Sequence, residues 1–156
     1  MLKPMTAELR KKIQLYRKNR LDISKLIEGI NIANEDLSYC IINKLILMHE
    51  DISKCDFSYA IIGLEGQTTI LTGCKLHYCS FKNTTFKGTL LLKRVEAHNC
   101  NFHETFMPFV DYQHADFRGS TFCDCVARMG GRAGHGAIID KSQIVKWGLK
   151  FNEEIV

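Results

Sequence analysis

A five-residue period runs through most of this chain and restricts what it can fold into. Residues 115–119 (ADFRG) and 120–124 (STFCD) are successive copies of one pattern, a small residue, a polar residue, an aromatic and two variable residues. Residues 55–59, 79–83 and 100–104 repeat it. An α-helix repeats every 3.6 residues and a strand every two, so neither produces this period. Ser, Thr, Cys and Phe are also weak helix formers, which disfavours a helical repeat.

Each unit has a bulky centre, which we call position i. The period begins near residue 35 and shifts its phase twice, near 64–66 and near 92–95. With Gly66 taken as a degenerate centre there are eighteen units, and position i−2 is Ala, Cys, Ser, Thr or Val in fourteen of them. The centres are Leu37, Ile42, Leu47, Ile52, Phe57, Ile62, Gly66, Leu71, Leu76, Phe81, Phe86, Leu91, Ala97, Phe102, Met107, Tyr112, Phe117 and Phe122.

This pattern resembles the pentapeptide-repeat family, whose consensus is Ala, Asp or Asn, Leu or Phe, and two variable residues. The match covers about residues 35–125. The resemblance implies an all-β solenoid, a right-handed quadrilateral β-helix in which each unit forms one side and four units form a coil. Eighteen units would then make about four and a half coils. Successive coils would pair their backbones at strand spacing, roughly 4.8 Å.

In such a coil the side chains at positions i and i−2 point inward from every side. Stacking successive coils predicts two core columns that fill the axis and leave no cavity for a ligand. The first column is Leu37, Phe57, Leu76, Ala97 and Phe117, and the second is Ile42, Ile62, Phe81, Phe102 and Phe122.

The chain divides into three segments. Residues 1–29 are expected to form an N-terminal helical cap, with Thr6 as N-cap, one apolar stripe (Leu9, Ile13 and Tyr16) and Gly29 as the stop. Residues 30–127 form the β-helix. Residues 128–156 form a Gly-rich connector and a C-terminal capping or dimerisation segment.

The C-terminal segment contains one further pattern. Its apolar residues alternate with Lys146, Gly148 and Lys150, which is typical of a half-buried strand. This strand would close the end of the stack or pair with a second copy. Known dimers of the family meet through their C-terminal ends, so the resemblance implies a homodimer. The apolar residues of the strand are Val145, Trp147, Leu149 and Phe151.

Positive charge is concentrated at the start of the chain. The net charge is +4, but residues 1–20 carry seven basic side chains against Glu8 alone, whereas residues 30–125 carry eight basic and eleven acidic residues. The helical cap could therefore either cover the end of the stack or contact phosphate or an anionic membrane. The residues of this basic contact are Arg10, Lys11, Lys12, Arg17, Lys18 and Arg20.

Motifs for catalysis, cofactors and metals are not recognisable. The sequence contains no Walker loop, HExxH, GxSxG or dinucleotide motif, so we expect no enzyme activity and no cofactor.

Five of the seven cysteines occupy position i−2, where thiols act as small apolar groups. Two outward pairs, His77 with His98 and His103 with Cys123, are predicted to stack. Each offers only two ligands, so no metal site is predicted.

Three functional interpretations remain. The first is a non-catalytic scaffold or interaction protein that binds another protein with a flat side of the β-helix. The second is a DNA mimic, because quinolone-resistance members of the family resemble duplex DNA and bind DNA gyrase or topoisomerase IV in its place. That role requires a dense negative surface, and the acids here are sparse. Nucleic-acid or membrane contact through the basic helix is the third. Without an export signal we expect a cytoplasmic protein with reduced thiols.

The dimer hypothesis predicts the effect of one substitution. Trp147→Asp places a charge in the middle of the apolar alternation, so the expected dimer should dissociate and the mass measured by light scattering should fall by about half. Lys146→Asp, on the opposite face of the same strand, is the control. A wild-type mass equal to that of one chain would contradict the hypothesis.

Overall fold

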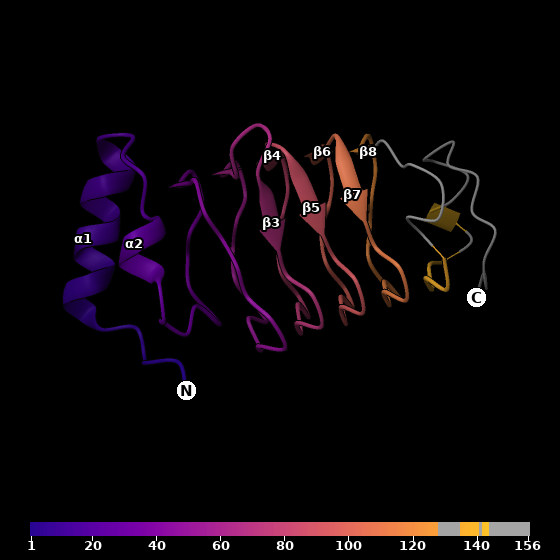
Figure 1. Ribbon diagram of the computed structural model, residues 1–156, viewed down its shortest axis with the longest axis horizontal. Coiled ribbons are helices and arrows are strands. Elements are labelled where there is room, and N and C mark those ends of the chain that lie inside the picture. Colours follow the sequence, from indigo (N-terminus) through magenta and orange to yellow (C-terminus); the bar gives the residue numbers. More distant parts are fainter. Residues whose placement is uncertain (128–134, 141, 144–156) are drawn as a thin grey trace.

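The computed structural model of the protein describes residues 1–127, 135–140, 142 and 143. It is a β-solenoid of about four turns built from parallel sheets, with two short helices stacked on its N-terminal end (Figure 1). The helices are α1 (Ala7–Lys18) and α2 (Ser24–Ile27). The strands are β1 (Ile41–Ile42), β2 (Ile61–Ile62), β3 (Thr68–Ile70), β4 (Thr85–Phe86), β5 (Thr89–Leu91), β6 (Phe106–Met107), β7 (Phe109–Asp111) and β8 (Val126–Ala127).

Each coil has four sides, because parallel backbone pairs recur at four places per turn. Strands β1, β2, β4, β6 and β8 form one sheet in that order, and β3, β5 and β7 form a second. Isolated bridges pair the other two sides, as between Asp36 and Asp56 and between Asp51 and Lys75. The predicted quadrilateral β-helix is therefore present, and the five-residue unit is one side of it.

We number the sides in chain order and name them by their inward centres. Side 1 comprises Leu37, Phe57, Phe81, Phe102 and Phe122. Side 2 comprises Ile42, Ile62, Phe86, Met107 and Ala127. Side 3 comprises Leu47, Leu71, Leu92 and Tyr112. Side 4 comprises Ile52, Leu76, Ala97, Phe117 and Ile139.

The predicted columns were wrong beyond the first phase shift. The backbone pairs Asp56 with Ser80 and Ile61 with Thr85, so a coil there spans 24 residues and contains an insertion. In a period of five, losing one residue and inserting four residues bring the pattern back to the same phase. The sequence pattern alone therefore cannot distinguish the two. Gly66, counted as a centre, is exposed in this insertion. Leu76 therefore does not stack on Phe57.

The membership of the two predicted columns changes accordingly. Leu76, Ala97 and Phe117 stack above Ile52 on side 4, and not above Leu37. Phe81, Phe102 and Phe122 continue the column of Leu37 and Phe57, and not that of Ile42 and Ile62. The nine ladder residues named from the sequence (Leu37, Ile42, Phe57, Ile62, Leu76, Phe81, Phe102, Phe117 and Phe122) are all at most 3% exposed.

Glycine makes room for the insertion. A Cβ on Gly88 would lie 2.3 Å from the carbonyl oxygen of Gln67, and a Cβ on Gly63 would lie 2.4 Å from that of Lys87. Both glycines have positive φ angles, +74° and +88°. The loop thus packs directly on the next coil, where a side chain would not fit. At the second shift one residue is added and Leu92, rather than the expected Leu91, is the buried centre.

Stacked phenylalanines fill the axis along side 1. Ring centroids are 5.2 Å apart from Phe57 to Phe81, 5.0 Å from Phe81 to Phe102 and 4.7 Å from Phe102 to Phe122, with planes within 10° of parallel. The strand spacing between coils imposes this separation, which also suits offset aromatic stacking. The column is therefore a solid core.

Hydrogen bonding, as well as size, selects the small residue at position i−2. Thr84 Oγ1 donates to the Phe57 carbonyl oxygen and Thr105 Oγ1 to that of Phe81, each at 2.7 Å, from one coil to the coil before. Cys100 Sγ donates to the Leu76 carbonyl oxygen at 2.8 Å. These side chains are buried, so the bonds satisfy groups that have no access to water.

The corners require a left-handed backbone conformation, which the sequence pattern does not indicate. In the described part of the chain thirteen non-glycine residues have positive φ, and most occupy position i+2, as Tyr59, Asn83 and Asn99 do. Left-handed geometry costs a residue with a Cβ roughly 1–2 kcal/mol. Positions treated as variable are thus conformationally restricted, and stacking of the coils must offset the strain.

The N-terminal cap follows the prediction closely. The Leu9 backbone N–H donates to Thr6 Oγ1 at 3.1 Å, so Thr6 is the N-cap. Ile13 is buried, with Leu9 and Tyr16 packed beside it. Lys3 pairs with Ile30 and Asp22 with Ile41, so the cap also continues the backbone pairing of the coils.

The described part of the C-terminal segment adds to the stack. Ile138 pairs with Asp116, and Ala137 and Ile139 are each 1% exposed, as positions i−2 and i of a unit on side 4. The remaining residues of the segment, including the dimer strand of Val145, Trp147, Leu149 and Phe151, lie outside the described residues.

The aromatic column makes a stability prediction. Phe81→Ala should lower the free energy of unfolding by about 3–5 kcal/mol, because the ring is stacked on both sides and the cavity cannot collapse between fixed coils. Lys82→Ala, an outward change in the same unit, should stay within about 0.5 kcal/mol. Urea denaturation measures both, and equal losses would contradict a solid axis.

Candidate functional site

The outward residues at position i−1 divide the solenoid into an apolar half and a polar half. On side 2 this row carries no charge, and on side 3 it is apolar until Asp111. The side 2 row is Ile41, Ile61, Thr85, Phe106 and Val126, and the side 3 row begins Ile46, Ile70 and Leu91. We call these eight residues the apolar face.

The apolar face is accessible to a partner. Phe106 is 43% exposed, Val126 47% and Ile46 49%, and Leu64 and Phe109 add exposed apolar surface near the corner between the two sides. At the N-terminal end Ile46 also lines a groove of about 460 Å³ between the coils and α2. Exposed apolar side chains in a contiguous row are a mark of an interaction surface.

Local structure explains why these residues lie there. Sides 2 and 3 are the sides on which strands form, and β-branched and aromatic residues favour strands. A signal for this face was available in the sequence but not used. Position i−1 reads Asp36, Ile41, Ile46 and Asp51 in the first coil, so polar and apolar residues alternate in pairs around the square.

The polar half carries acids, and two of them, Asp36 and Asp116, are paired with arginines. Its i−1 rows are Asp36, Asp56, Ser80, Asn101 and Thr121 on side 1, and Asp51, Lys75, Glu96, Asp116 and Ile138 on side 4. Asp36 contacts Arg17 at 3.2 Å, and on the neighbouring side 3 Lys93 Nζ lies 3.1 Å from Asp111 Oδ2. Asp116 is bound by both Arg118 and His98. These pairs reduce the negative potential of this surface.

Two outward histidines stack on side 4, as the register predicted. The rings of His77 and His98 have centroids 4.7 Å apart. His77 Nε2 lies 3.5 Å from Glu96 Oε2, and His98 Nε2 lies 2.9 Å from Asp116 Oδ2. Because Asp116 already accepts hydrogen bonds from Arg118, a metal ion here would have to displace an arginine.

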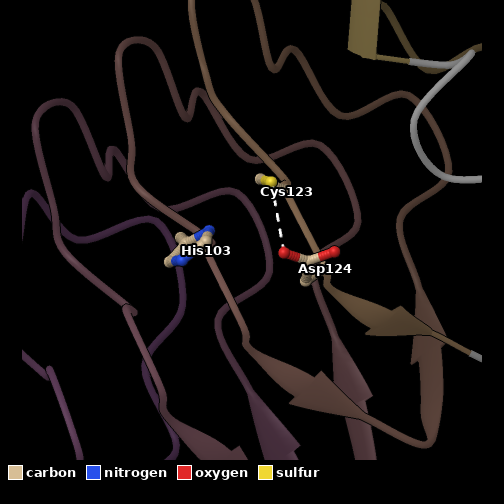
Figure 2. Close-up of side chains that lie close together, drawn as sticks. All are labelled: His103, Cys123 and Asp124. Atoms are coloured by element: carbon tan, nitrogen blue, oxygen red, sulfur yellow. Dashed lines mark hydrogen bonds between the residues drawn. The ribbon is translucent and has the colours of Figure 1, made fainter.

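The second outward pair forms a three-residue cluster at the C-terminal end of side 1. His103 and Cys123 follow the stacked centres Phe102 and Phe122, and Asp124 stands beside them (Figure 2). One ligand atom from each of the three residues lies within 4.8 Å of the others. The cluster combines nitrogen, sulfur and oxygen donors. Asp124 was not associated with this pair from the sequence, because its corner position was read as variable.

Two of the six basic cap residues serve the fold. Arg10 makes a bidentate ion pair with Glu35 at 2.6 and 2.8 Å, and Arg17 contacts Asp36. These pairs fasten α1 to the first coil. The other four basic side chains (Lys11, Lys12, Lys18 and Arg20) are exposed. No helix among the described residues is long and apolar enough to cross a membrane.

No protein-family model and no curated protein matches the chain. Two similar solved structures are a pentapeptide repeat protein from the Arabidopsis thaliana thylakoid lumen (17% identity, TM-score 0.21) and a trypsin-treated variant of QnrB1, a plasmid-mediated fluoroquinolone resistance protein (14% identity, TM-score 0.21). The match covers 69% of this chain and 59% of the thylakoid protein, and 80% of this chain and 81% of QnrB1.

At such TM-scores neither likeness decides the fold, which follows instead from the backbone pairing and burial of the units. Units of five residues occupy the four sides, each with an inward centre and an inward small residue. The chain folds as a pentapeptide-repeat β-helix.

Burial makes most cysteines of this β-helix chemically inert. Cys55, Cys79 and Cys100 form one column on side 1. Burial raises the pKa of the Cys55 and Cys79 thiols well above their usual range and that of Cys100 to about 11. Such thiols are poor nucleophiles and poor metal ligands at neutral pH.

Asp116 provides a pH-dependent prediction. Partial burial by itself raises its pKa, but the hydrogen bonds from Arg118 and the close contact with His98 Nε2 outweigh burial and lower the pKa to about 2. A carboxyl with a lowered pKa stabilises the fold above its usual pKa, and this contribution is lost as pH falls through the folded value. Stability should therefore fall between about pH 4 and pH 2 more steeply in the wild type than in Asp116→Asn.

Thermal melts at successive pH values measure the difference, and NMR titration of the Asp116 carboxyl measures the pKa directly. Arg118→Gln should raise that titration midpoint toward the ordinary value for aspartate. A midpoint that does not move in Arg118→Gln would contradict the role given to the arginine.

Proposed function

We propose that this protein is a non-catalytic interaction protein that binds a protein partner with the apolar face. The observation that carries the proposal is the uncharged outer row of side 2, which ends in the exposed residues Phe106 and Val126. Surfaces of water-exposed sheets normally carry polar residues on the outer face. A row of five uncharged residues, of which only Thr85 has a polar group, departs from that rule.

The geometry of the face favours a flat protein surface as partner over a small ligand. The coils lie at strand spacing, so side chains on the row repeat at roughly 4.8 Å and form a ladder rather than a pocket. Aromatic residues such as Phe106 and Phe109 contribute strongly at protein interfaces. The solid axis behind the ladder keeps it rigid, which lowers the entropic cost of binding.

Imitation of DNA toward gyrase or topoisomerase IV receives less support. Such imitation depends on a continuous negative surface, since phosphate contacts dominate the recognition of DNA. Here Asp36, Asp111 and Asp116 are paired with cations, and Lys75 interrupts the acidic row of side 4. A separate proposal is that the four exposed basic residues in α1 and just after it contact an anionic surface. That contact would not depend on the apolar face.

The proposal predicts a side-specific effect of added charge. Val126→Asp or Phe106→Asp should abolish capture of the partner from a lysate of the cells that produce the protein, because a buried unpaired carboxylate costs several kcal/mol. Thr121→Asp is the matched control, since Thr121 is exposed in the same coil on side 1. Retention of the same partner by Phe106→Asp, or its loss from Thr121→Asp, would overturn the proposal.

A further inference from the structure

Among the described residues, one group of three side chains that could chelate a metal lies on the last two coils of side 1. Position i+1 of side 1 is Ser38, Ser58, Lys82, His103 and Cys123 in successive coils, and position i+2 is Tyr39, Tyr59, Asn83, Glu104 and Asp124. The first coils therefore offer hydroxyl groups and stacked tyrosine rings, 4.8 Å apart. The last two offer an imidazole, a thiol and two carboxylates.

The backbone around this cluster is fixed by bonds between the two coils. Glu104 N donates to the Cys123 carbonyl oxygen at 2.9 Å, and Phe102 N donates to that of Thr121 at 2.8 Å. The Phe102 and Phe122 rings stack directly behind the cluster. His103 and Cys123 are consequently held one strand spacing apart, and only their side-chain torsions remain to be adjusted.

The distances suit a small ion. Zinc binds histidine nitrogen at about 2.0–2.1 Å and cysteine sulfur at about 2.3 Å, so tetrahedral ligand atoms lie about 3.5 Å apart. The three ligand atoms here lie within 4.8 Å of one another, and Cys123 Sγ and Asp124 Oδ2 are 3.4 Å apart (Figure 2). Closure to coordination distance therefore needs side-chain movements of about 1 Å and no change of the backbone.

The donor set selects the kind of metal. A thiolate with an imidazole and a carboxylate suits zinc, whereas magnesium and calcium require oxygen ligands alone. The cluster is half-exposed, which allows an ion to enter: the His103 side chain is 33% exposed, and Asp124 is exposed. Glu104 Oε2 lies 3.8 Å from His103 Nε2 and borders the fourth position of a tetrahedral site.

We propose that His103, Cys123 and Asp124 form a zinc site that clamps two successive coils together on side 1 of the β-helix. Binding forms bonds from zinc to the imidazole nitrogen, the thiolate sulfur and a carboxylate oxygen. The thiol proton of Cys123 is released to solvent on binding. The ion would link residues 21 positions apart in the sequence, close to the point where the chain leaves the regular repeat, and would stabilise the end of the stack.

The test uses the full-length, reduced protein stripped of metal with a chelator. Titration with zinc chloride against a zinc indicator should show one strong site per chain, and calorimetry in buffers of different ionisation enthalpy should show release of about one proton per ion. Cobalt chloride should give the near-ultraviolet charge-transfer absorption of a cobalt–thiolate bond. Zinc should also raise the melting temperature, because it binds the folded state.

Substitutions assign the ligands. Cys123→Ser should abolish the cobalt–thiolate absorption, and His103→Ala should weaken zinc binding by at least about tenfold, the loss that even outer-shell changes cause. Both residues lie on the surface, so the circular dichroism of the metal-free variants should match that of the wild type. Asp124→Asn should weaken binding without removing the thiolate band.

Two matched variants serve as controls. Cys125→Ser removes a thiol two residues away, whose burial raises its pKa to about 12, and His98→Ala removes a histidine of the other stacked pair. Both should bind zinc as the wild type does. Absence of the thiolate band in the wild type, its persistence in Cys123→Ser, or loss of binding in His98→Ala would overturn the proposal.

Discussion

Backbone hydrogen bonding between successive coils is the interaction on which the rest of this structure depends. Each coil donates to and accepts from its neighbours at four places per turn, and this fixes the vertical spacing of every side chain. The phenylalanine column, the donors at position i−2 and the outward rows are all consequences of that spacing. A change in one coil is therefore felt mainly by the coils directly above and below it, as in other solenoids.

The same regularity separates structural from functional roles within each unit. Positions i and i−2 are used by the core, and position i+2 is restricted by its left-handed backbone. Positions i−1 and i+1 remain for surface chemistry. On sides 2 and 3 this freedom produces an apolar face, and at the C-terminal end of side 1 it places His103 and Cys123 side by side, next to Asp124 at position i+2. Any binding surface of this protein would thus be formed by outward residues that stack at the same position in successive coils of one side.

The ends of the stack require different solutions from its middle. At the N-terminus α1 covers the first coil with Ile13 and is fastened by Arg10 to Glu35 and by Arg17 to Asp36. The basic residues that stood out in the sequence are in part the means of that attachment. Their charge thus has a structural explanation at two positions, which composition alone did not distinguish from a phosphate-binding role.

The sequence alone determined the five-residue unit, most of the inward positions, the helical cap with Thr6 as its N-cap and the burial of the cysteines at position i−2. All of these depend on contacts inside one unit or between neighbouring units. It could not determine the columns, because a shift of −1 and an insertion of four residues leave the same phase in a period of five. Only the tertiary structure showed that the chain inserts a loop there and places Phe81 on Phe57. The apolar face and the partnership of Asp124 with His103 also became visible only then, because both join residues about one coil apart, and that separation depends on how each coil closes.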